Sequence, residues 1–305
     1  QNQVDLTDNL HLTLGGRFNY ARIDADQVQD PNTNNQISID EEFSSVVGSA
    51  RATWEILPDE LTLFGGVSQG FRAPNVGDLT RFDTARSNEF ETPAPGLDEE
   101  EYLTFEIGTK AQVGTFSAQA AYFYTDIDDQ IIRFPTGDVV SGNNEVTKSN
   151  VGDGQVFGAE LTAAWAFDPS WTLFGNAAYV EGEVTTFPTS AQVKEEEYLS
   201  RLMPLTGQIG LRWDPPRSRF WAEGIVRMAT EADKLSTRDQ NDTQRIPPGG
   251  TPGYAVLSLR GGWQVNEHLS LVAALENVTD ENYRIHGSGQ NEPGINAILT
   301  LRGTF

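Results

Sequence analysis

Segments in which apolar and polar residues alternate strictly recur along the whole chain. Because successive side chains of a strand point to opposite faces, each such segment predicts a strand with one apolar and one mostly polar face. The clearest segment, 157–167, places Phe157 and Leu161 opposite Glu160 and Thr162. The twelve predicted strands are 10–20, 48–56, 61–68, 102–112, 116–124, 157–167, 171–179, 208–213, 220–228, 255–263, 269–275 and 295–305.

The connections between these strands alternate between two lengths. Short turns of about two to four residues alternate with connections of roughly fifteen to thirty residues. A soluble sandwich rarely sorts its connections in this way, whereas bacterial outer-membrane barrels have short periplasmic turns and long extracellular loops. We therefore expect an all-β fold, a transmembrane antiparallel β-barrel in the bacterial outer membrane. The expected extracellular loops are 25–43, 73–100, 127–154, 181–204, 230–253 and 276–294.

The positions of the tryptophans indicate the same environment. Five of the six lie on an apolar face within three residues of a short turn, namely Trp54, Trp165, Trp171, Trp213 and Trp263. Indole prefers the membrane interface, because its ring is apolar while its N–H can bond with water, and this preference produces the aromatic girdles of membrane barrels. A soluble core would scatter its tryptophans along the strands.

The overall composition is compatible with a membrane barrel and argues against several other classes. Only 38% of the residues are hydrophobic, but a barrel presents lipid with only every second residue of a strand. The net charge of −23 argues against nucleic acid as a partner. The absence of cysteine excludes disulfides and thiolate metal sites. No run approaches the roughly 20 apolar residues of a transmembrane helix, and the chain starts without a signal-peptide pattern, which indicates a processed protein or a fragment.

The last predicted strand, 295–305, has the length of a membrane-spanning strand, about 9–11 residues. It ends on Phe305, and a terminal strand ending in an aromatic residue is common in outer-membrane barrels. Phe305 is therefore predicted to be an assembly signal. Taken alone, this segment is equally compatible with a half-buried strand of a soluble sandwich, so the interpretation depends on the rest of the chain.

Two segments resemble a known family, the TonB-dependent outer-membrane receptors. Residues 65–79, which contain Phe71, Arg72, Ala73 and Pro74, resemble the "FRAP" segment of that family. Residues 276–305 resemble its C-terminal signature. The two segments occur in the family's order and are separated by the expected hairpins.

This resemblance implies that the chain is part of a larger receptor. The family has an N-terminal TonB box, a globular plug and a 22-stranded barrel. Twelve predicted strands and no plug imply that residues 1–305 form the C-terminal half of such a barrel. A closed barrel of twelve strands is the alternative.

The implied function is active transport rather than enzymatic catalysis. The family binds a scarce nutrient such as an iron chelate (siderophore), haem, cobalamin or a glycan at its extracellular loops and imports it with energy from TonB. The implied partners are membrane lipid and lipopolysaccharide, the TonB-ExbB-ExbD system acting through a plug, the barrel-assembly machinery, and the missing N-terminal half or a separate plug chain. The alternative function is an autonomous plugless pore or structural barrel.

The candidate ligand-binding residues lie in the last long loop and are Tyr283, Arg284 and His286. In haem receptors of the family, a histidine in the loop after the FRAP segment ligates iron, but residues 75–99 contain no histidine. We expect no resident cofactor and no metal site. The acidic runs 24–26, 99–101 and 126–129 leave Ca²⁺ as an alternative to plain solvated charge, although none has EF-hand spacing.

Charged residues of both signs recur on the predicted polar faces. On a face that points into a barrel, they indicate ion-pair networks that hold a plug or line a channel; the alternative is that they only solvate the lumen. They include Arg17, Arg51, Glu55, Arg72, Glu106, Lys110, Glu160, Arg212, Glu223, Arg227, Arg260, Glu276 and Arg302.

Overall fold

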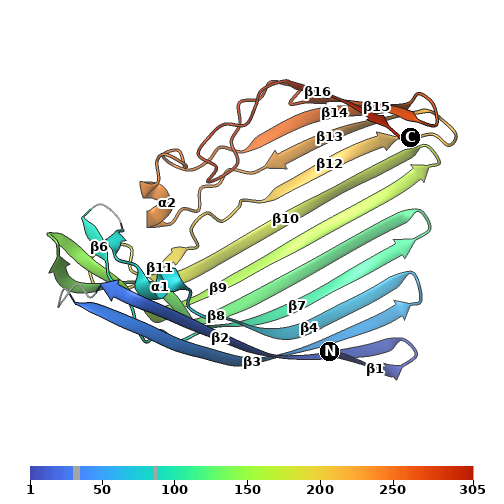
Figure 1. Ribbon diagram of the computed structural model, residues 1–305. Coiled ribbons are helices and arrows are strands. Elements are labelled where there is room, and N and C mark those ends of the chain that lie inside the picture. Colours follow the sequence, from blue (N-terminus) through green and yellow to red (C-terminus); the bar gives the residue numbers. More distant parts are fainter. Residues whose placement is uncertain (30–34, 86–87, 305) are drawn as a thin grey trace.

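The computed structural model describes residues 1–29, 35–85 and 88–304. In these residues, thirteen strands follow one another in a single antiparallel sheet (Figure 1). They are β1 Asn2–Thr7, β2 Leu10–Gln29, β3 Gln36–Leu57, β4 Leu61–Arg72, β7 Glu100–Val113, β8 Phe116–Val140, β9 Asn143–Asp168, β10 Trp171–Thr186, β12 Thr206–Trp213, β13 Phe220–Ala229, β14 Tyr254–Gln264, β15 Leu269–Glu276 and β16 Asn296–Gly303. The short strands β5 Asp83–Thr84, β6 Glu89–Glu91 and β11 Glu195–Tyr198 lie off this path.

All twelve strands predicted from the alternation are present, and the structure adds one more. The additional strand, β1, pairs with the first residues of β2 through the turn at Asp8 and Asn9. The prediction missed it because it is only six residues long and mostly polar, with Val4 and Leu6 as its only apolar residues. The prediction of twelve strands was therefore one short of the thirteen on the main path, and it also missed the short strands β5, β6 and β11.

Two of the predicted loops, 25–43 and 127–154, were largely wrong, because they consist mostly of strand. Strands β2 and β3 remain paired as far as Gln29 and Gln36, and β8 and β9 meet at Val140 and Asn143. Their Asp-, Asn- and Gly-rich sequence predicts a loop, but pairing with a neighbouring strand overrides weak intrinsic β-propensity. These strands extend well beyond the length needed to cross a bilayer.

The two kinds of connection lie at opposite ends of the sheet (Figure 1). The short turns gather at one end. The long connections gather at the other, together with the helices α1 Val76–Thr80 and α2 Thr237–Asn241. No helix in the described ranges is both long and apolar enough to cross a membrane. This sorting matches the predicted topology of periplasmic turns and extracellular loops.

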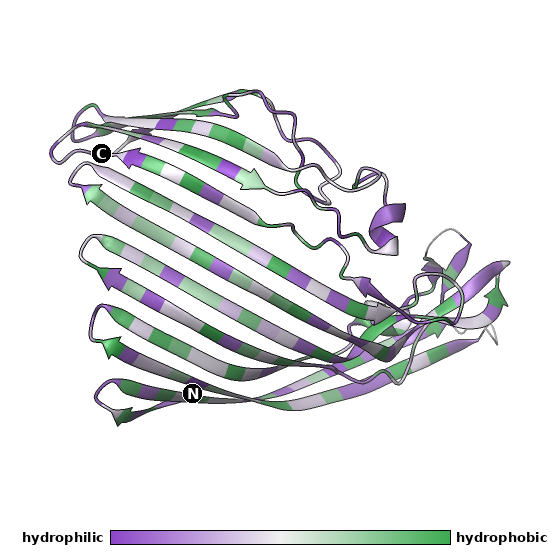
Figure 2. Cartoon of the chain, turned by 180° about the vertical axis from the view of Figure 1, so that it is seen from behind, coloured by the Kyte–Doolittle hydropathy of each residue, from purple (hydrophilic) through white to green (hydrophobic). Residues whose placement is uncertain are grey.

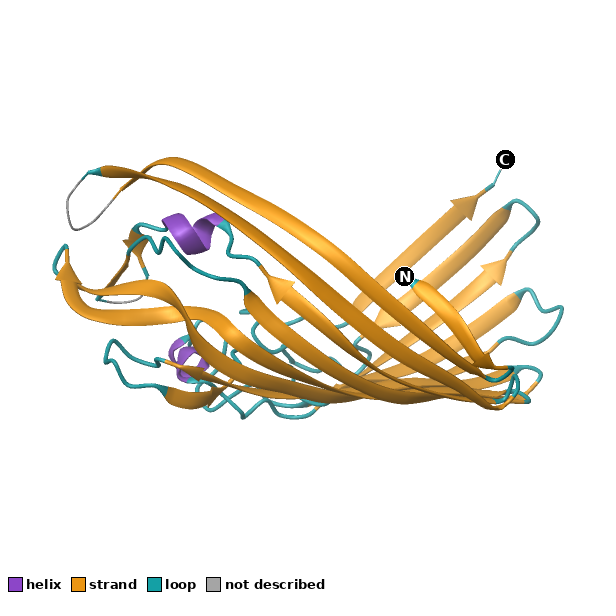
Figure 3. Ribbon diagram, turned by 90° about the horizontal axis from the view of Figure 1, so that it is seen from below, coloured by secondary structure: helices purple, strands orange, loops and turns teal. Residues whose placement is uncertain are grey.

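The sheet is curved but open (Figure 3). Strands β1 and β16 form its two edges, and no pairing joins them in the described residues. A membrane-spanning sheet must pair its edges, because lipid offers no hydrogen bonds to exposed backbone groups. An open sheet of this kind is what part of a larger barrel wall looks like, in agreement with the predicted fold class.

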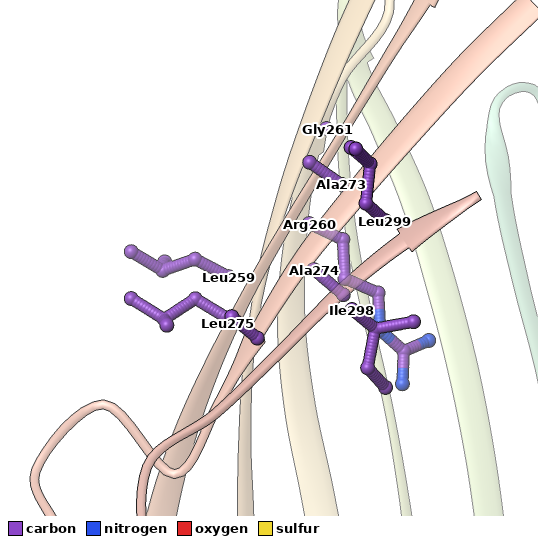
Figure 4. Close-up of a pocket in the computed structure, with 9 residues that line it drawn as sticks. Leu259, Arg260, Gly261, Ala273, Ala274, Leu275, Ile298 and Leu299 are labelled. Atoms are coloured by element: carbon purple, nitrogen blue, oxygen red, sulfur yellow. The ribbon is translucent and has the colours of Figure 1, made fainter. Parts of the chain in front are cut away.

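The two faces of the sheet have opposite character, as the alternating colours along the strands show (Figure 2). The apolar face exposes large side chains, including Ile107 at 64% and Leu299 at 71%. The close-up in Figure 4 shows Leu259 and Leu275 pointing to one side of the sheet and Arg260 to the other. Exposure of so many large apolar side chains is explained by lipid contact.

The polar face carries ion pairs that join different strands, and the pair of Arg51 in β3 with Glu106 in β7 spans β4. Arg51 lies 2.7 Å from Glu106, and Arg212 lies 3.6 Å from Glu223. Similar charges continue along the face, as at Arg260 and Glu276 at 3.8 Å. These pairs correspond to the mixed-sign lumen surface expected from the sequence.

Aromatic side chains on the polar face lie over glycines of the neighbouring strand. Each of the four pairs is in direct cross-strand register: Phe64 with Gly108, Phe123 with Gly158, Phe174 with Gly210, and Trp221 with Gly262. In all four, an added Cβ on the glycine would come within 3 Å of the ring. The glycines therefore leave room for the rings to lie flat on the sheet.

Candidate ligand-binding site

The FRAP segment forms the junction between strand β4 and the long connection that follows it. Arg72, the last residue of β4, binds Glu100 through two hydrogen bonds of 2.6 Å. Arg72 also donates to Asp78 at 2.8 Å, and Glu100 accepts from the Tyr102 hydroxyl and from the Ile131 backbone N–H. The buried carboxylate of Glu100 thus connects β4, β7 and β8, and Arg72 extends the connection to the helix α1.

The rest of the FRAP segment leads directly into α1. Asn75 caps this helix and forms a reciprocal capping box with Asp78. Behind it, Leu79 is fully buried in an apolar cluster. The other buried members of that cluster are Val28, Ile39, Phe43, Ala94, Leu97 and Ile131, so the connection packs against the extended β2 and β3. Arg72 therefore anchors a folded loop rather than a loose one.

A second buried ion pair attaches the connection between β10 and β12 to the connection between β4 and β7. Arg133 of β8 lies 2.6 Å from Glu89, with both side chains at most 10% exposed. Arg133 also donates to the backbone carbonyls of Phe187 and Thr189, and Ser190 donates to Glu89 at 2.7 Å. Together with the Arg72 cluster, these contacts form what we call the first loop assembly.

The last three connections form a second loop assembly around Asp239 of α2. This carboxylate is 1% exposed and accepts from the Ser200 hydroxyl at 2.6 Å and the Arg201 backbone N–H at 3.1 Å. Arg201 in turn donates to Asp242 at 3.0 Å. Residues that are about forty positions apart in the chain are thereby held together.

His286, one of the predicted ligand-binding residues, lies inside this second assembly. It is only 8% exposed, and its Nδ1 is 2.9 Å from the Thr251 hydroxyl. Burial and the nearby Arg201 lower the pKa of His286, while Asp239 opposes that effect. The lowered pKa favours the neutral imidazole at neutral pH, and the hydrogen bond to Thr251 joins two connections.

The other two predicted residues lie nearer the surface of the same connection. Tyr283 packs against Tyr254 of β14, with ring centroids 4.6 Å apart. Burial and the carboxylate of Glu292 raise the pKa of the Tyr283 phenol, which therefore stays protonated at neutral pH. Arg284 points elsewhere, toward Asn291 at 2.9 Å and the Arg245 carbonyl. The structure thus brings Tyr283 and Tyr254 together and separates them from His286 and Arg284.

Several residues that shape this end were not among the sequence predictions. Asn277 is 3% exposed; its side chain donates to the carbonyls of Glu281 and Pro293 and accepts from the Glu281 N–H. It closes the connection that carries Tyr283 and has a left-handed φ of 50°. Tyr254 and Asp239 were missed as well, because their partners are distant in sequence.

The acidic runs have different surroundings. Glu100 is hydrogen-bonded to Arg72. By contrast, Asp126, Asp128 and Asp153 lie near one another. Burial, together with the negative charge of these neighbours, raises the pKa of Asp128. Within residues 1–29, 35–85 and 88–304, no three or more His, Cys, Asp or Glu side chains are arranged to hold a metal ion. Phe305, the predicted assembly signal, lies outside the described residues.

The sequence is similar to known outer-membrane receptors. The pesticin receptor of Yersinia pestis is 23% identical over 291 residues, which cover 92% of this chain and 38% of that protein. The catecholate siderophore receptor Fiu of Escherichia coli K12 is 26% identical over 184 residues, which cover 59% of this chain and 22% of that protein. The chain therefore spans well under half the length of these curated relatives.

Solved structures share the same fold. The copper transporter OprC superposes with a TM-score of 0.77 at 16% identity, over 99% of this chain and 47% of that one. The ferric yersiniabactin uptake receptor FyuA from Yersinia pestis superposes with a TM-score of 0.65 at 19% identity, over 99% and 44% of the two chains.

The model of the family "TonB dependent receptor-like, beta-barrel" matches residues 1–278, most of the chain. This match agrees with the open, two-faced sheet and with the FRAP segment at its extracellular end. The chain belongs to the TonB-dependent receptor-like β-barrel family of the bacterial outer membrane.

Proposed function

We propose that this chain is part of an outer-membrane receptor that binds a ferric chelate at its extracellular end and imports it with energy from the TonB system. The family match carries this proposal, and the names of the relatives, a pesticin receptor and a catecholate siderophore receptor, support the substrate class. The TonB-ExbB-ExbD system, a plug and the barrel-assembly machinery are the partners proposed with it.

The proposed contact site is the polar face near Tyr254 and Tyr283. Strand β13 places Arg227 opposite Val256 of β14, two residues from Tyr254 and on the same face of the sheet. Paired phenol rings offer a surface on which an aromatic ligand can stack, and a guanidinium pairs with its anionic oxygens. Iron chelates that use aromatic oxygen donors have both features.

The second loop assembly supports this surface. Asn277 fixes the connection that carries Tyr283, and His286 joins that connection to the one at Thr251. His286 and Arg284 therefore act in the proposal by holding the loops, while Tyr283 contacts the chelate.

Growth of iron-starved cells tests this function. Cells in which the gene is deleted are complemented with the complete parent gene, and growth on a panel of ferric chelates is compared with and without TonB. We expect growth on at least one aromatic-oxygen chelate to need both the receptor and TonB. Uptake that persists without TonB would favour a passive pore instead.

Variants at the site refine the test. Replacing Tyr283→Ala or Arg227→Gln should weaken chelate binding to the purified receptor. Tyr122→Ala, which changes a tyrosine on the apolar face, is the matched control. Equal affinity of all three variants for the chelate would show that Tyr283 and Arg227 are not part of the site.

A further inference from the structure

The four aromatic–glycine pairs of the polar face share a position in the topology. Each joins two strands that follow one another at the extracellular end of the sheet (Figure 1). These strand pairs are β4 with β7, β8 with β9, β10 with β12, and β13 with β14. Among the residues that the structure describes, no ring lies over a glycine between strands joined by a short turn of the opposite end. The aromatic–glycine pairs therefore occur only where the connection is at the extracellular end.

At that end the connections do not fix the register of the strands. A tight turn fixes which residues of a hairpin face each other, but three of these strand pairs are joined by the long segments 73–99, 187–205 and 230–253. Strands β8 and β9 meet in a tight turn, yet three register shifts between Ile127 and Val139 separate that turn from Phe123. The apolar pattern excludes a slip by one residue but permits a slip by two, which leaves the same face toward lipid.

Each glycine is a single gap in a row of larger side chains. The residues two positions before and after it point to the same face of the sheet. They are Glu106 and Lys110 around Gly108, Val156 and Glu160 around Gly158, Gln208 and Arg212 around Gly210, and Arg260 and Gln264 around Gly262. Even a Cβ at Gly210 would lie 2.3 Å from the Phe174 ring. A ring can therefore lie flat on the neighbouring strand in one register, because a slip by two residues places a long side chain beneath it.

We propose that the four aromatic–glycine pairs are register locks, which align neighbouring strands of the barrel wall where no turn does so. In two of them an arginine of the preceding strand covers the other side of the ring. The guanidinium carbon of Arg51 lies 4.7 Å from the Phe64 ring centroid, and that of Arg212 lies 4.4 Å from the Trp221 ring centroid. A ring held between a glycine and a guanidinium loses both contacts when the strands slip.

The register of β10 and β12 can be measured with three cysteine pairs. Thr206→Cys is combined with Ala178→Cys, its partner in register, or with Asn176→Cys or Val180→Cys, which would face it after a slip by two residues. Diagonal positions have Cα atoms about 7–8 Å apart, beyond the usual reach of a disulfide. In the complete receptor in outer membranes, peptide mass spectrometry identifies the joined positions after oxidation. The Ala178 pair should form efficiently and the other two poorly.

Four changes then test the lock between Phe174 and Gly210. Phe174→Leu removes the ring and should raise the two slipped disulfides several-fold, whereas Phe174→Tyr keeps a ring and should match the parent. Leu173→Ala is the control for a general loss of stability, because Leu173 is the adjacent residue on the apolar face and is 37% exposed. The double change Gln208→Gly and Gly210→Gln moves the gap by two residues. It should shift the main disulfide from the Ala178 pair to the Asn176 pair, because the ring follows the gap.

Three outcomes would overturn the proposal. The first is a parent-like distribution of disulfides in Phe174→Leu, and the second is an equal rise of the slipped disulfides in Leu173→Ala. The third is a dominant Ala178 pair after the gap has been moved. If Phe174→Leu does not reach the outer membrane, the double variant decides, since it keeps both a ring and a gap. The proposal is independent of the ligand transported, and no uptake is measured, so failure of the proposed function would leave this result unchanged.

Discussion

Arg72 and Glu100 form a two-point ion pair between neighbouring strands, in which two guanidinium nitrogens each lie 2.6 Å from a different carboxylate oxygen. The side chain of Glu100 is only 3% exposed, and it also accepts from Tyr102 and from the Ile131 backbone. This pair makes the arginine of the FRAP segment the anchor of the first loop assembly.

Replacing Arg72→Lys should loosen that assembly. Lysine cannot make the planar two-point contact, so buried oxygens of Glu100 lose a charged partner. We expect local unfolding of residues 73–99 to become easier by about 2 kcal/mol, measured by amide hydrogen exchange. Arg22→Lys is the control, because the two-point pair of Arg22 with Asp40 is about half exposed and should matter little. Similar effects of the two changes would contradict the anchoring role.

The second loop assembly should loosen in acid because of His286. Burial lowers the pKa of His286 below its ordinary value of 6.5 in the folded state, so the unfolded loops bind a proton more readily. The stabilisation is therefore complete above about pH 6.5 and declines as the pH falls below it. The protection factors of the amides in residues 236–253 and 277–294, which correct for the intrinsic pH dependence of exchange, should therefore fall over this range.

Two histidine variants check that prediction. His286→Gln should remove the pH dependence of the protection factors in both segments. His268→Gln should retain it, because His268 lies in a short turn at the opposite end of the sheet. An unchanged pH profile in His286→Gln would assign the effect to another group.

The aromatic–glycine pairs of the polar face should make some glycines indispensable. A Cβ at Gly108 would lie 2.3 Å from the Phe64 ring and 2.6 Å from the Ala120 carbonyl oxygen. Gly108→Ala should therefore cost about 1–3 kcal/mol of stability, followed by tryptophan fluorescence in urea. At Gly16 a Cβ meets nothing within 4 Å, so Gly16→Ala should be close to neutral. Comparable losses at both positions would argue against the packing role.

The assignment of the two faces can be tested at adjacent residues of β9. Leu161 is 49% exposed on the apolar face, and Thr162 points to the opposite side. Leu161→Arg should cost about 2–4 kcal/mol if the position is near the bilayer midplane, because the guanidinium would enter lipid. Thr162→Arg should cost much less. Equal losses in unfolding from lipid vesicles would indicate a two-sided protein core.

The strands were predictable because the alternation of apolar and polar residues is a local signal in the sequence. This alternation is regular here because one face of the sheet contacts lipid. The extensions of β8 and β9 were not, since their pairing overrides a loop-like composition between Asp126 and Gly154. Strand β1 was missed because six mostly polar residues carry too little alternation.

The candidate site was predictable only in part. The sequence pointed to Arg72 as a motif residue, but it grouped Glu100 with an acidic run that was considered for Ca²⁺. Their pairing depends on the register that places Arg72 directly opposite Glu100, twenty-eight positions later in the chain. In the same way, Tyr283 was predicted from its loop position, whereas Tyr254 is identified only by the fold.

The central claim is that these strands are a segment of a larger barrel wall, with β1 and β16 as edges that pair with other strands. These 305 residues contain no cysteine, so a disulfide formed between two of their positions joins engineered cysteines. Cysteines are placed one at a time along β1, from Asn2 to Thr7, each together with Thr300→Cys in β16. The pair Val272→Cys and Thr300→Cys, which are in register, is the positive control.

In the complete receptor in outer membranes, oxidation should link the control pair and none of the β1–β16 pairs. The register in β15 and β16 places the control residues within reach of a disulfide, whereas the open sheet keeps the two edges apart. Efficient formation of any β1–β16 disulfide within one chain would contradict the account and show a small barrel that closes on itself.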